Sequence, residues 1–463
     1  MGRQGIPSTP RAVGRTGGAG SMSDVREILG GWQSDGIGFV RFELPDMHGI
    51  SRSKTIPIAH AFDYAERGLN MYGGASVLDT RSDVVPGTLY HDEKGYGDQL
   101  LFPDPNSAAV IPWMDRTARL ICDAQWYDGT PLAATPRSVF RRAQDKARSM
   151  GFDTLMGSEF EFYLLTGDTH EPLFDGYQIF NTVRNDYVPT IRRIIEEMSK
   201  VGVDIITANC EYAGSQWEIN FAPGRGLAGP DDAFTFKNGV KEIAKQDGYL
   251  ATFMTKPWGD RSGSGCHTHL SLLSTDSGTN AFGDPDDPQG MTDTCRSFIA
   301  GILKYARAFD AVIAPTVNCL RRRRPHTFSP SNISWGLEDR SALVRVKGGG
   351  SEHKHIEYRA PSALSNPYLV GAALIQAGLR GIEERLPAPE PAKPGMPAEE
   401  DPSFEKLPIA LEESLQALEQ EPATKEFFGE EFVTAYSAMR RYELSRFTDW
   451  VTDWERAEYL ELF

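Results

Sequence analysis

The stretch MGSEFEFYLL, residues 156–165, decides the architecture of this chain because two acids alternate with two phenylalanines inside an apolar segment. Successive side chains of a strand point to opposite faces, so Glu159 and Glu161 share one face while Phe160 and Phe162 pack on the other. Two half-buried carboxylates side by side repel each other and lose hydration unless a positive charge lies between them. The stretch therefore predicts a core strand that presents two acids to a cation.

Three further segments carry chemistry in a similar pattern. The groups are Glu211 and Glu218 in CEYAGSQWEIN, His267 and His269 in GCHTHLSL, and Glu357 and Arg359 in HIEYRAP. Three of the four segments use an i, i+2 spacing, which on a strand directs both side chains into one cavity. Five carboxylates and two imidazoles that converge in one cavity require a metal to offset their repulsion.

The composition of this side-chain set indicates which metal it binds. Carboxylate-rich sites with few nitrogen ligands suit Mg²⁺ or Mn²⁺, whereas zinc favours more histidine or cysteine. Two adjacent divalent ions serve to neutralise the phosphates of ATP and an acyl phosphate made from it. A phosphoryl-transfer ligase is the hypothesis that follows.

Arginines in strand and turn segments add anion-binding capacity. Guanidinium groups suit carboxylate and phosphate recognition, and the candidates are Arg322, Arg340, Arg345 and Arg359. The run RRRRPH, which begins at Arg321, by itself is typical of a nuclear-localisation or nucleic-acid patch. In a chain of net charge −16 it is better interpreted as part of an anion pocket.

The bulk composition is that of a multi-domain globular protein of 463 residues. Five scattered cysteines without CxxC spacing indicate neither a disulfide framework nor a thiolate zinc site, so we expect a cytoplasmic protein. No apolar run reaches the length of a membrane span, and the start lacks the apolar core of a signal peptide. Residues 1–22 are predicted to form a disordered leader or a non-native extension.

The order of predicted elements suggests two parts. Residues 36–57 read as two strands joined by a turn, and strand and loop signals continue to Asp123. A helix over 132–150, capped by Thr135, follows a domain boundary near 124–135. Helices are then predicted over 189–202, 238–250 and 367–386, and strands over 156–165, 215–223, 251–257 and 265–273. Residues 386–402 are predicted to be an exposed Pro-rich loop. The tail from Leu407 is predicted to form two or three helices.

At this point the chain resembles the glutamine synthetase family from about Val25 to its C-terminus, and most closely the γ-glutamylamide branch. The motifs that carry the resemblance are GSEFEF, EYAGSQWE, FMTKPWGDRSGSGCHTHLS, NCLRRRRPHTFSP, WGLEDRSALVRV, IEYRAPSALSNPYL and RYELSRFTDWVTDWE. The resemblance implies an α+β fold with an N-terminal β-grasp domain, residues 23–124, and a catalytic domain, residues 130–463, whose curved antiparallel sheet is flanked by helices. It also implies a ring-shaped homo-oligomer, a dodecamer, with active sites shared between neighbours.

The resemblance also implies a role for individual residues. One metal would be held by Glu161, Glu211 and Glu218, and the other by Glu159, His267 and Glu357. ATP would meet His269, Ser271, Arg340 and Arg345, while glutamate would meet Glu161, Gly263, Arg322 and Arg359. Asp46 of the adjacent subunit and Tyr177 would flank the amine, and Asp46, Glu211 and Arg340 would act in catalysis. The implied reaction is phosphorylation of the glutamate γ-carboxylate by ATP, followed by attack of an amine.

Three positions depart from the family pattern. Phe328 stands where an acid is expected to close the ammonium site, Ser262 replaces an Asn and His355 replaces an Arg. A phenyl ring offers dispersion to an apolar amine but no attraction for a small cation. We therefore expect an organic amine, aryl or small alkyl, because a polyamine would favour acids around its second ammonium. The Tyr that some bacterial relatives have adenylylated is also missing between Leu386 and Leu407.

Three alternatives remain open at this level. The chain could be an ammonia-using glutamine synthetase with a displaced base, or a catalytically silent structural member of the family. A nucleic-acid binder built on the arginine run is the third. All six implied metal ligands are present, which favours an active enzyme over a silent member of the family or a nucleic-acid binder.

Overall fold

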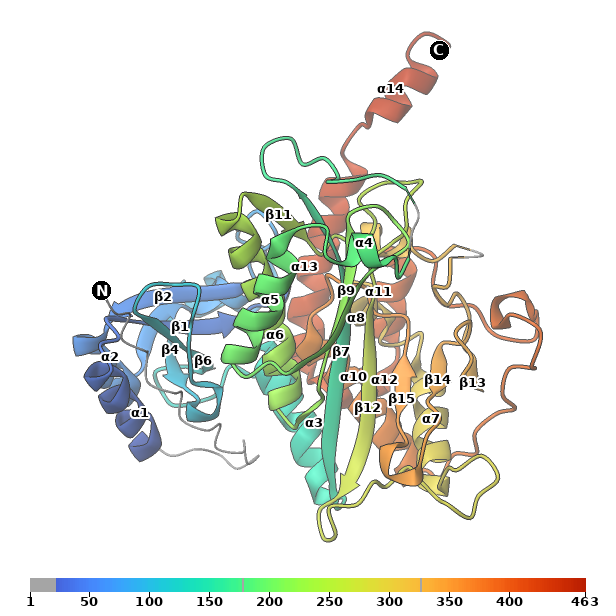
Figure 1. Ribbon diagram of the computed structural model, residues 1–463, viewed down its shortest axis with the longest axis horizontal. Helices are drawn as coiled ribbons and strands as arrows, with labels where there is room; N and C mark the ends of the chain where they lie inside the picture. The colour runs from blue at the N-terminus through green and yellow to red at the C-terminus, as the bar shows by residue number, and fades with distance from the viewer. Residues whose placement is uncertain (1–21, 177–178, 325–326) are drawn as a thin grey trace.

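The computed structural model describes residues 22–176, 179–324 and 327–463. The predicted leader lies outside the described residues except for Met22, the first residue of α1 (Met22–Ser34). The predicted hairpin forms as β1 (Phe39–Pro45) and β2 (Ser51–Pro57), paired antiparallel. Figure 1 shows this N-terminal part in blue beside the larger remainder of the chain.

The N-terminal sheet is mixed. Its strand order is β2-β1-β6-β4-β3, β1 and β6 run parallel, and β5 pairs with β6. The remaining elements are α2 (Ile58–Arg67), β3 (Leu69–Tyr72), β4 (Asp98–Pro103), β5 (Ala109–Val110) and β6 (Thr117–Gln125). Helices α1 and α2 were not foreseen from the sequence. The predicted boundary at 124–135 falls on the segment between β6 and α3 (Pro136–Ser149).

The second sheet carries the functional segments. Its order is β13-β14-β15-β12-β7-β9-β8, with β10 and β11 also paired to β7. Among the described strands of this sheet, only β13 and β14 pair in parallel. Its strands are β7 (Phe152–Thr166), β8 (Ile205–Cys210), β9 (Gln216–Phe221), β10 (Gly224–Arg225), β11 (Tyr249–Thr252), β12 (Cys266–Ser274), β13 (Trp335–Leu337), β14 (Val344–Val346) and β15 (Ile356–Tyr358). The curled sheet and its helices confirm the predicted α+β class.

Helices support this sheet from one side. Helix α6 contacts β7 and β11, α3 contacts β7, and α10 packs on both α3 and α7. The helices between α3 and the tail are α4 (Thr182–Asn185), α5 (Pro189–Lys200), α6 (Ala228–Gln246), α7 (Asp293–Tyr305), α8 (Asp310–Ile313), α9 (Val317–Leu320) and α10 (Pro367–Glu383). Asn366 caps α10 by accepting a hydrogen bond from the Tyr368 amide, and Pro367 occupies the first turn, as its sequence predicted.

Three expectations need correction. The helix predicted from residue 238 begins at Ala228, because the burial of residues 229–237 outweighs the low helix propensity of the Gly, Pro, Asp and Thr residues among them. The Pro-rich segment 386–402 is irregular as predicted but not wholly exposed, since Ala392 and Ala398 are buried. The tail forms four helices rather than two or three: α11 (Leu411–Gln420), α12 (Pro422–Phe428), α13 (Glu430–Thr448) and α14 (Asp453–Tyr459). Helix α14 extends away from the body (Figure 1) and buries none of its residues.

Candidate active site

Strand β7 has the two-faced structure that its alternation predicts. Phe160 and Phe162 are fully buried and lie against Phe236 and Phe253 on the helix side. The two acids of β7 occupy the opposite face. Strand register then places ligands across from them: Glu159 pairs with His267 of β12, and Glu161 pairs with Glu218 of β9. Directly opposed like charges destabilise a sheet, so the Glu161–Glu218 pair calls for a cation.

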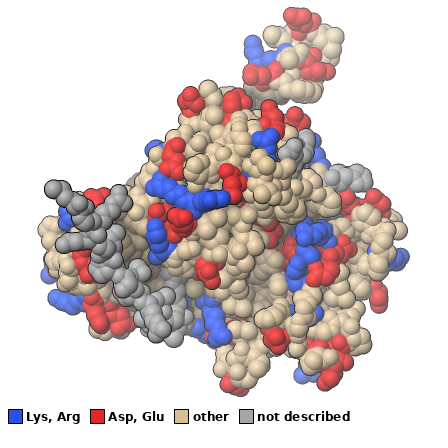
Figure 2. Space-filling model, in the orientation of Figure 1, with Lys and Arg blue, Asp and Glu red and all other residues tan. Residues whose placement is uncertain are grey.

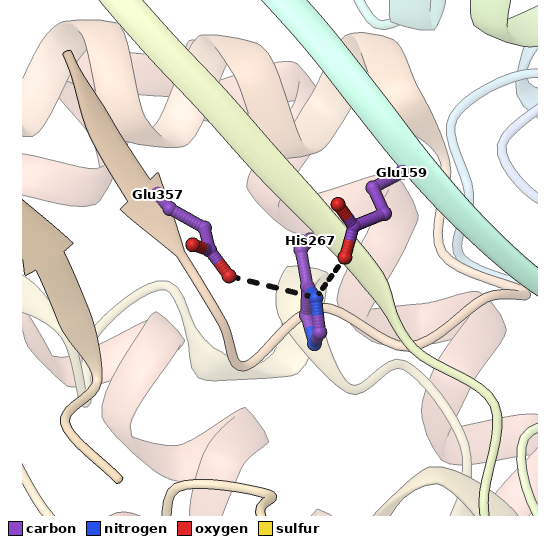
Figure 3. Close-up of side chains that lie close together, drawn as sticks. All are labelled: Glu159, His267 and Glu357. Atoms are coloured by element: carbon purple, nitrogen blue, oxygen red, sulfur yellow. Dashed lines mark hydrogen bonds and ion pairs between the residues drawn. The ribbon is translucent and has the colours of Figure 1, made fainter. Parts of the chain in front are cut away.

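Glu159, His267 and Glu357 form a compact group. Figure 3 shows them extending from β7, β12 and β15 toward one another. His267 Nδ1 lies 2.8 Å from Glu159 Oε1 and 3.6 Å from Glu357 Oε1, and one potential ligand atom of each residue lies within 4.8 Å of the others. Burial opposes the ionisation of both acids. His267 and His269 nevertheless lower the pKa of Glu159, and His267 and Arg359 lower the pKa of Glu357 to about 2. Both carboxylates are therefore anionic at neutral pH, as metal ligands would be.

The second predicted ligand set has an excess of negative charge. Glu161 Oε2 accepts a hydrogen bond of 2.8 Å from the Gly265 amide. Burial, followed by repulsion from Glu161, raises the pKa of Glu211 to about 8. Burial and repulsion from Glu159 and Glu161 raise the pKa of Glu218 to about 10. A bound divalent cation would relieve this repulsion, so the donor set fits a hard metal ion.

The two sets differ in compactness. Among the described residues, the group of three whose ligand atoms approach one another within 4.8 Å is Glu159, His267 and Glu357. Strand register places Glu161 and Glu218 on the same face of the sheet as Glu159, but with Glu211, which follows β8, they are not gathered as tightly. Assignment of all six residues to two metals remains a prediction.

Arg322 is buried at the centre of the site. Its guanidinium lies 3.3–3.5 Å from the carbonyl oxygens of residues 359–361 and 3.3 Å from His267 Nε2. Burial lowers its pKa, although the charge of Glu161 opposes that shift. A Cβ at Gly265 would lie 2.4 Å from Arg322 Nη2, and one at Gly263 would lie 2.9 Å from its Cγ. Glycine at these two positions therefore leaves the space that the arginine occupies.

The rest of the arginine run does not form a basic patch. The Arg323 side chain is buried and pairs with Asp310, so it does not contribute to a basic surface. Arg321 and Arg324 are exposed. Thr327 donates hydrogen bonds to the carbonyls of Arg322 and Arg324, while His326 lies outside the described residues.

Two other predicted arginines are already paired with carboxylates. Arg345 donates to Glu357 Oε2 at 3.0 Å and also pairs with Glu338. Arg359 pairs with Glu357 and donates to the carbonyl of Phe328 at 3.4 Å. Arg340 is exposed. Arg345 and Arg359 thus hold Glu357, and ATP or glutamate would have to share them.

The predicted nucleotide residues lie along β12 and beside it. His267, His269 and Ser271 occupy alternate positions of that strand and so share a face. His269 Nε2 lies 3.7 Å from Glu159 Oε2, and the His269 ring is 5.2 Å from that of His355. His355 Nδ1 is 2.7 Å from the His353 carbonyl oxygen, and burial lowers its pKa. This places His355 next to the predicted phosphate-binding strand without the fixed charge of an arginine.

Asp46 is fully buried within its own chain. Its oxygens accept hydrogen bonds from the amides of His48 and Ile50, each at 2.9 Å, and from Arg52 Nε at 2.8 Å. Although burial opposes ionisation, interactions with His48 and Arg52 hold the pKa of Asp46 below its ordinary value. Its role in a neighbouring subunit's site stays a prediction, as does that of Tyr177, which lies outside the described residues.

Phe328 is an exposed residue in a strained conformation. Its φ is +54°, its side chain is 58% exposed, and its ring stacks on Tyr212 with a centroid distance of 6.2 Å and an angle of 15°. Tyr212, Glu338 and Asn220 were missed by the sequence reasoning. Asn220 donates to Glu159 at 3.0 Å and could have been found, because it follows Glu218 at the same i, i+2 spacing. Nothing in the sequence pattern pointed to Tyr212 or Glu338.

Comparison with known proteins supplies the relationships. The family "Glutamine synthetase, catalytic domain" matches residues 133–459. A gamma-glutamylethanolamide synthetase from Streptomyces coelicolor is 35% identical over 435 residues, which cover 90% of this chain and 92% of that protein. A glutamate–isopropylamine ligase from a Pseudomonas species is 31% identical and covers 95% of this chain and 97% of its own. Glutamine synthetases match at similar identity.

The fold comparison agrees with these relationships. A solved structure described as a GmaS/ADP complex aligns with a TM-score of 0.84 at 28% sequence identity. The alignment covers 94% of this chain and 99% of that one.

Proposed function

The chain belongs to the glutamine synthetase family, and from this premise we propose that it is an ATP-dependent ligase that joins glutamate to an organic amine. In the reaction, a γ-carboxylate oxygen of glutamate attacks the γ-phosphorus of ATP, and ADP leaves. The amine nitrogen then attacks the acyl carbon, inorganic phosphate leaves, and the nitrogen loses one proton. The product is a γ-glutamylamide.

The residues of the site divide this work. Arg322 and Arg359 would bind the carboxylates of glutamate, and Arg340 and Arg345 would face the phosphates. Two divalent ions, Mg²⁺ or Mn²⁺, held by the six predicted ligands would neutralise phosphate charge. Arg322 is buried and donates to the carbonyls of residues 359–361, and Arg359 pairs with Glu357, so both side chains are held in position before substrate binds, which supports this assignment.

The observation that carries the choice of an organic amine is Phe328. An acid at this position would attract ammonium, whereas the exposed ring stacked on Tyr212 presents an apolar wall. Arylamines suit such a wall because they are neutral at pH 7 and need no deprotonation before attack. A small alkylamine is the other candidate, and Asp46 or Glu211 of the predicted catalytic set would take its proton.

The test compares ATP turnover with glutamate and ammonium, methylamine, isopropylamine, ethanolamine, putrescine or aniline. We expect the wild type to prefer an apolar amine. Phe328→Glu should raise kcat/KM for ammonium relative to isopropylamine by about tenfold or more, because a carboxylate replaces an apolar surface. Phe328→Leu is the matched control and should keep the wild-type preference. Ammonium as the best substrate of the wild type would instead identify an ammonia-using glutamine synthetase.

We further propose a ring-shaped homo-oligomer, a dodecamer, in the cytoplasm. The C-terminal arm, residues 449–463, supports assembly because it exposes Trp450, Trp454, Leu462 and Phe463 away from the body of its own chain. Removal of residues 450–463 should reduce the particle size measured by sedimentation velocity. An unchanged size would exclude the arm from assembly. The burial of all five cysteines as free thiols is compatible with a reducing compartment.

Small molecules are the proposed ligands, and we propose that neither nucleic acid nor a membrane is a partner. On the face drawn in Figure 2, basic and acidic side chains are interspersed rather than gathered by sign. The net charge of −16 also disfavours a phosphate backbone. Among the described residues, no helix combines the length and the apolar character that crossing a bilayer requires.

A further inference from the structure

A pocket of about 740 Å³ lies beside Phe328. Three segments form most of its wall: Phe328 and Ser329, the end of β13 with the following turn, and residues 391–397 of the Pro-rich loop. Gln289 and Glu399 complete the lining. Its volume is within the range of small-molecule sites. The lining contains none of the predicted glutamate-binding residues and none of the predicted metal ligands.

The loop wall of this pocket is fixed by hydrogen bonds. The Ala392 amide donates to the Trp335 carbonyl at 2.7 Å, and Trp335 Nε1 donates to the Pro389 carbonyl at 2.7 Å. The Ala398 amide donates to Ser341 Oγ at 2.8 Å. Because the loop is bonded to β13 and to the turn after it, the pocket is a built cavity rather than a gap under a loose segment.

The pocket adjoins the predicted reaction centre. Phe328 forms part of its wall, and the Phe328 carbonyl accepts a hydrogen bond from Arg359, which pairs with the ligand Glu357. Arg340, predicted to meet the phosphates, also lines it. A molecule in the pocket would therefore contact both the amine-specificity residue and a residue of the phosphoryl-transfer site.

The lining is apolar with a polar margin. Leu337, Ala392 and Met396 join Phe328 and several prolines in the wall. Ser329 is 1% exposed, and its hydroxyl has no hydrogen-bond partner within the described residues.

The margin of the pocket carries as many acids as cations. Arg340 and Lys393 line the pocket with Asp339 and Glu399. The Asp339 carboxylate accepts hydrogen bonds from the Ser341 amide at 2.8 Å and hydroxyl at 2.7 Å, and these neutral donors leave its charge in place. Because the four charges balance, the margin offers no net counter-charge, and a ligand whose far end is neutral is favoured.

We propose that this pocket holds the substituent of the amine substrate. The substrate class is then a primary amine with an apolar substituent the size of a ring, whose far end is neutral. This inference rests on the proposed ligase function and narrows it. It assigns the Pro-rich loop, which the predicted chemistry does not use, to substrate selection.

The test is steady-state turnover with methylamine, benzylamine, 4-(aminomethyl)benzoate and 4-(aminomethyl)benzylamine under saturating ATP and glutamate. We expect kcat/KM for benzylamine to exceed that for methylamine by about tenfold or more, since burial of the ring adds apolar contact. The benzoate and the diamine should both fall below benzylamine, because the margin offers no net counter-charge to a charged far end.

Filling the pocket gives the decisive comparison. Met396 is 43% exposed, so Met396→Trp can fold, and it should lower the benzylamine-to-methylamine ratio of kcat/KM by about tenfold or more. Leu337→Trp should lower this ratio in the same way. Ile409, 82% exposed and outside the lining, provides the control Ile409→Trp, which should keep the wild-type ratio. If methylamine is used but both pocket variants keep that ratio, the pocket inference is wrong and the ligase proposal stands. If no organic amine is used by the wild type, the ligase proposal itself fails.

Discussion

The face of the second sheet that carries the predicted metal ligands adjoins the surroundings of Phe328. The first is built on paired strands and the second on irregular segments. The acids and His267 project from paired strands, and strand register brings them together. Phe328 lies on an irregular segment at positive φ, and its neighbours come from loops. Side chains on a paired strand tolerate little change in position, whereas loops can change with little effect on the sheet. We infer that the sheet carries the common reaction and the loops carry the choice of amine.

Substitution of a predicted metal ligand on the sheet should produce the largest fall in turnover, and the fall should be the same for every amine. Glu159→Gln removes a carboxylate that meets His267 and Asn220, so kcat should fall by about 1000-fold or more for ammonium and every amine alike. Turnover assays with each amine measure the fall, and thermal melting with Mn²⁺ and with EDTA measures the metal-dependent stabilisation, which should shrink. Glu171→Gln, on an exposed turn, is the control. A loss that differed among amines would contradict the division between sheet and loop.

The next largest effect should follow substitution of Glu338, a residue that connects the two regions. Glu338, at φ +51°, pairs with Arg345 and accepts a hydrogen bond from the Gly348 amide. Glu338→Gln should release Arg345 from one of its two carboxylates and raise KM for ATP by about tenfold, with little change in KM for glutamate. Initial rates at varied ATP and varied glutamate separate these constants.

The control for that experiment is Glu461→Gln in the C-terminal arm, which should alter neither constant. If Glu338→Gln raised both KM values equally, Glu338 would support the fold of the site in general and would not position Arg345. Glu338 is a positioning residue in this account because it acts through Arg345.

The same contrast explains what the sequence could predict. The opposite faces of Glu159 and Phe160 follow from the two-residue period of a strand, and a residue pattern reveals that period. The pairing of Arg345 with Glu357 depends on the register between β14 and β15, and no local pattern encodes that register. The Tyr212–Phe328 stack joins two loops 116 positions apart in the chain. Loop conformation and long-range contact therefore limited the prediction more than the chemistry of the residues did.

The sheet region also contains a buried charge whose effect on stability should vary with pH. Lys237 of α6 donates to the Ser365 carbonyl at 3.2 Å and lies 5.8 Å from the Phe160 ring centroid. Burial, followed by repulsion from Lys241, lowers its pKa from 10.5 to about 7. Between those two values the unfolded chain binds more protons than the folded chain, so stability rises with pH. Below pH 7 the full cost of burying the ammonium is present.

Lys237→Met should therefore raise the free energy of unfolding by about 1–3 kcal/mol at pH 6.5, after allowing for the lost hydrogen bond. The gain should shrink as the pH approaches 10. Denaturant unfolding followed by tryptophan fluorescence at pH 6.5 and 9.5 measures it, and Lys245→Met, at an exposed position on the same helix, is the control. A gain of equal size at both pH values would show that packing, rather than protonation, causes it.

The smallest expected effect comes from the loop side, at Tyr212. Its ring is 43% exposed and stacks on Phe328, so Tyr212→Ala removes one face of the apolar wall while leaving Glu211 in place. Such ring pairs contribute about 0.5–1.5 kcal/mol, so KM for an apolar amine should rise by about threefold to tenfold. KM for ATP should stay unchanged, because the residues predicted to bind its phosphates lie on β12 and β14 or in the turn after β13. Tyr212→Phe retains the ring and should behave as the wild type. A rise in KM for ATP equal to that for the amine would mean that Tyr212 acts through the neighbouring ligand Glu211, and the separation between the sheet and the loops would then fail at this residue.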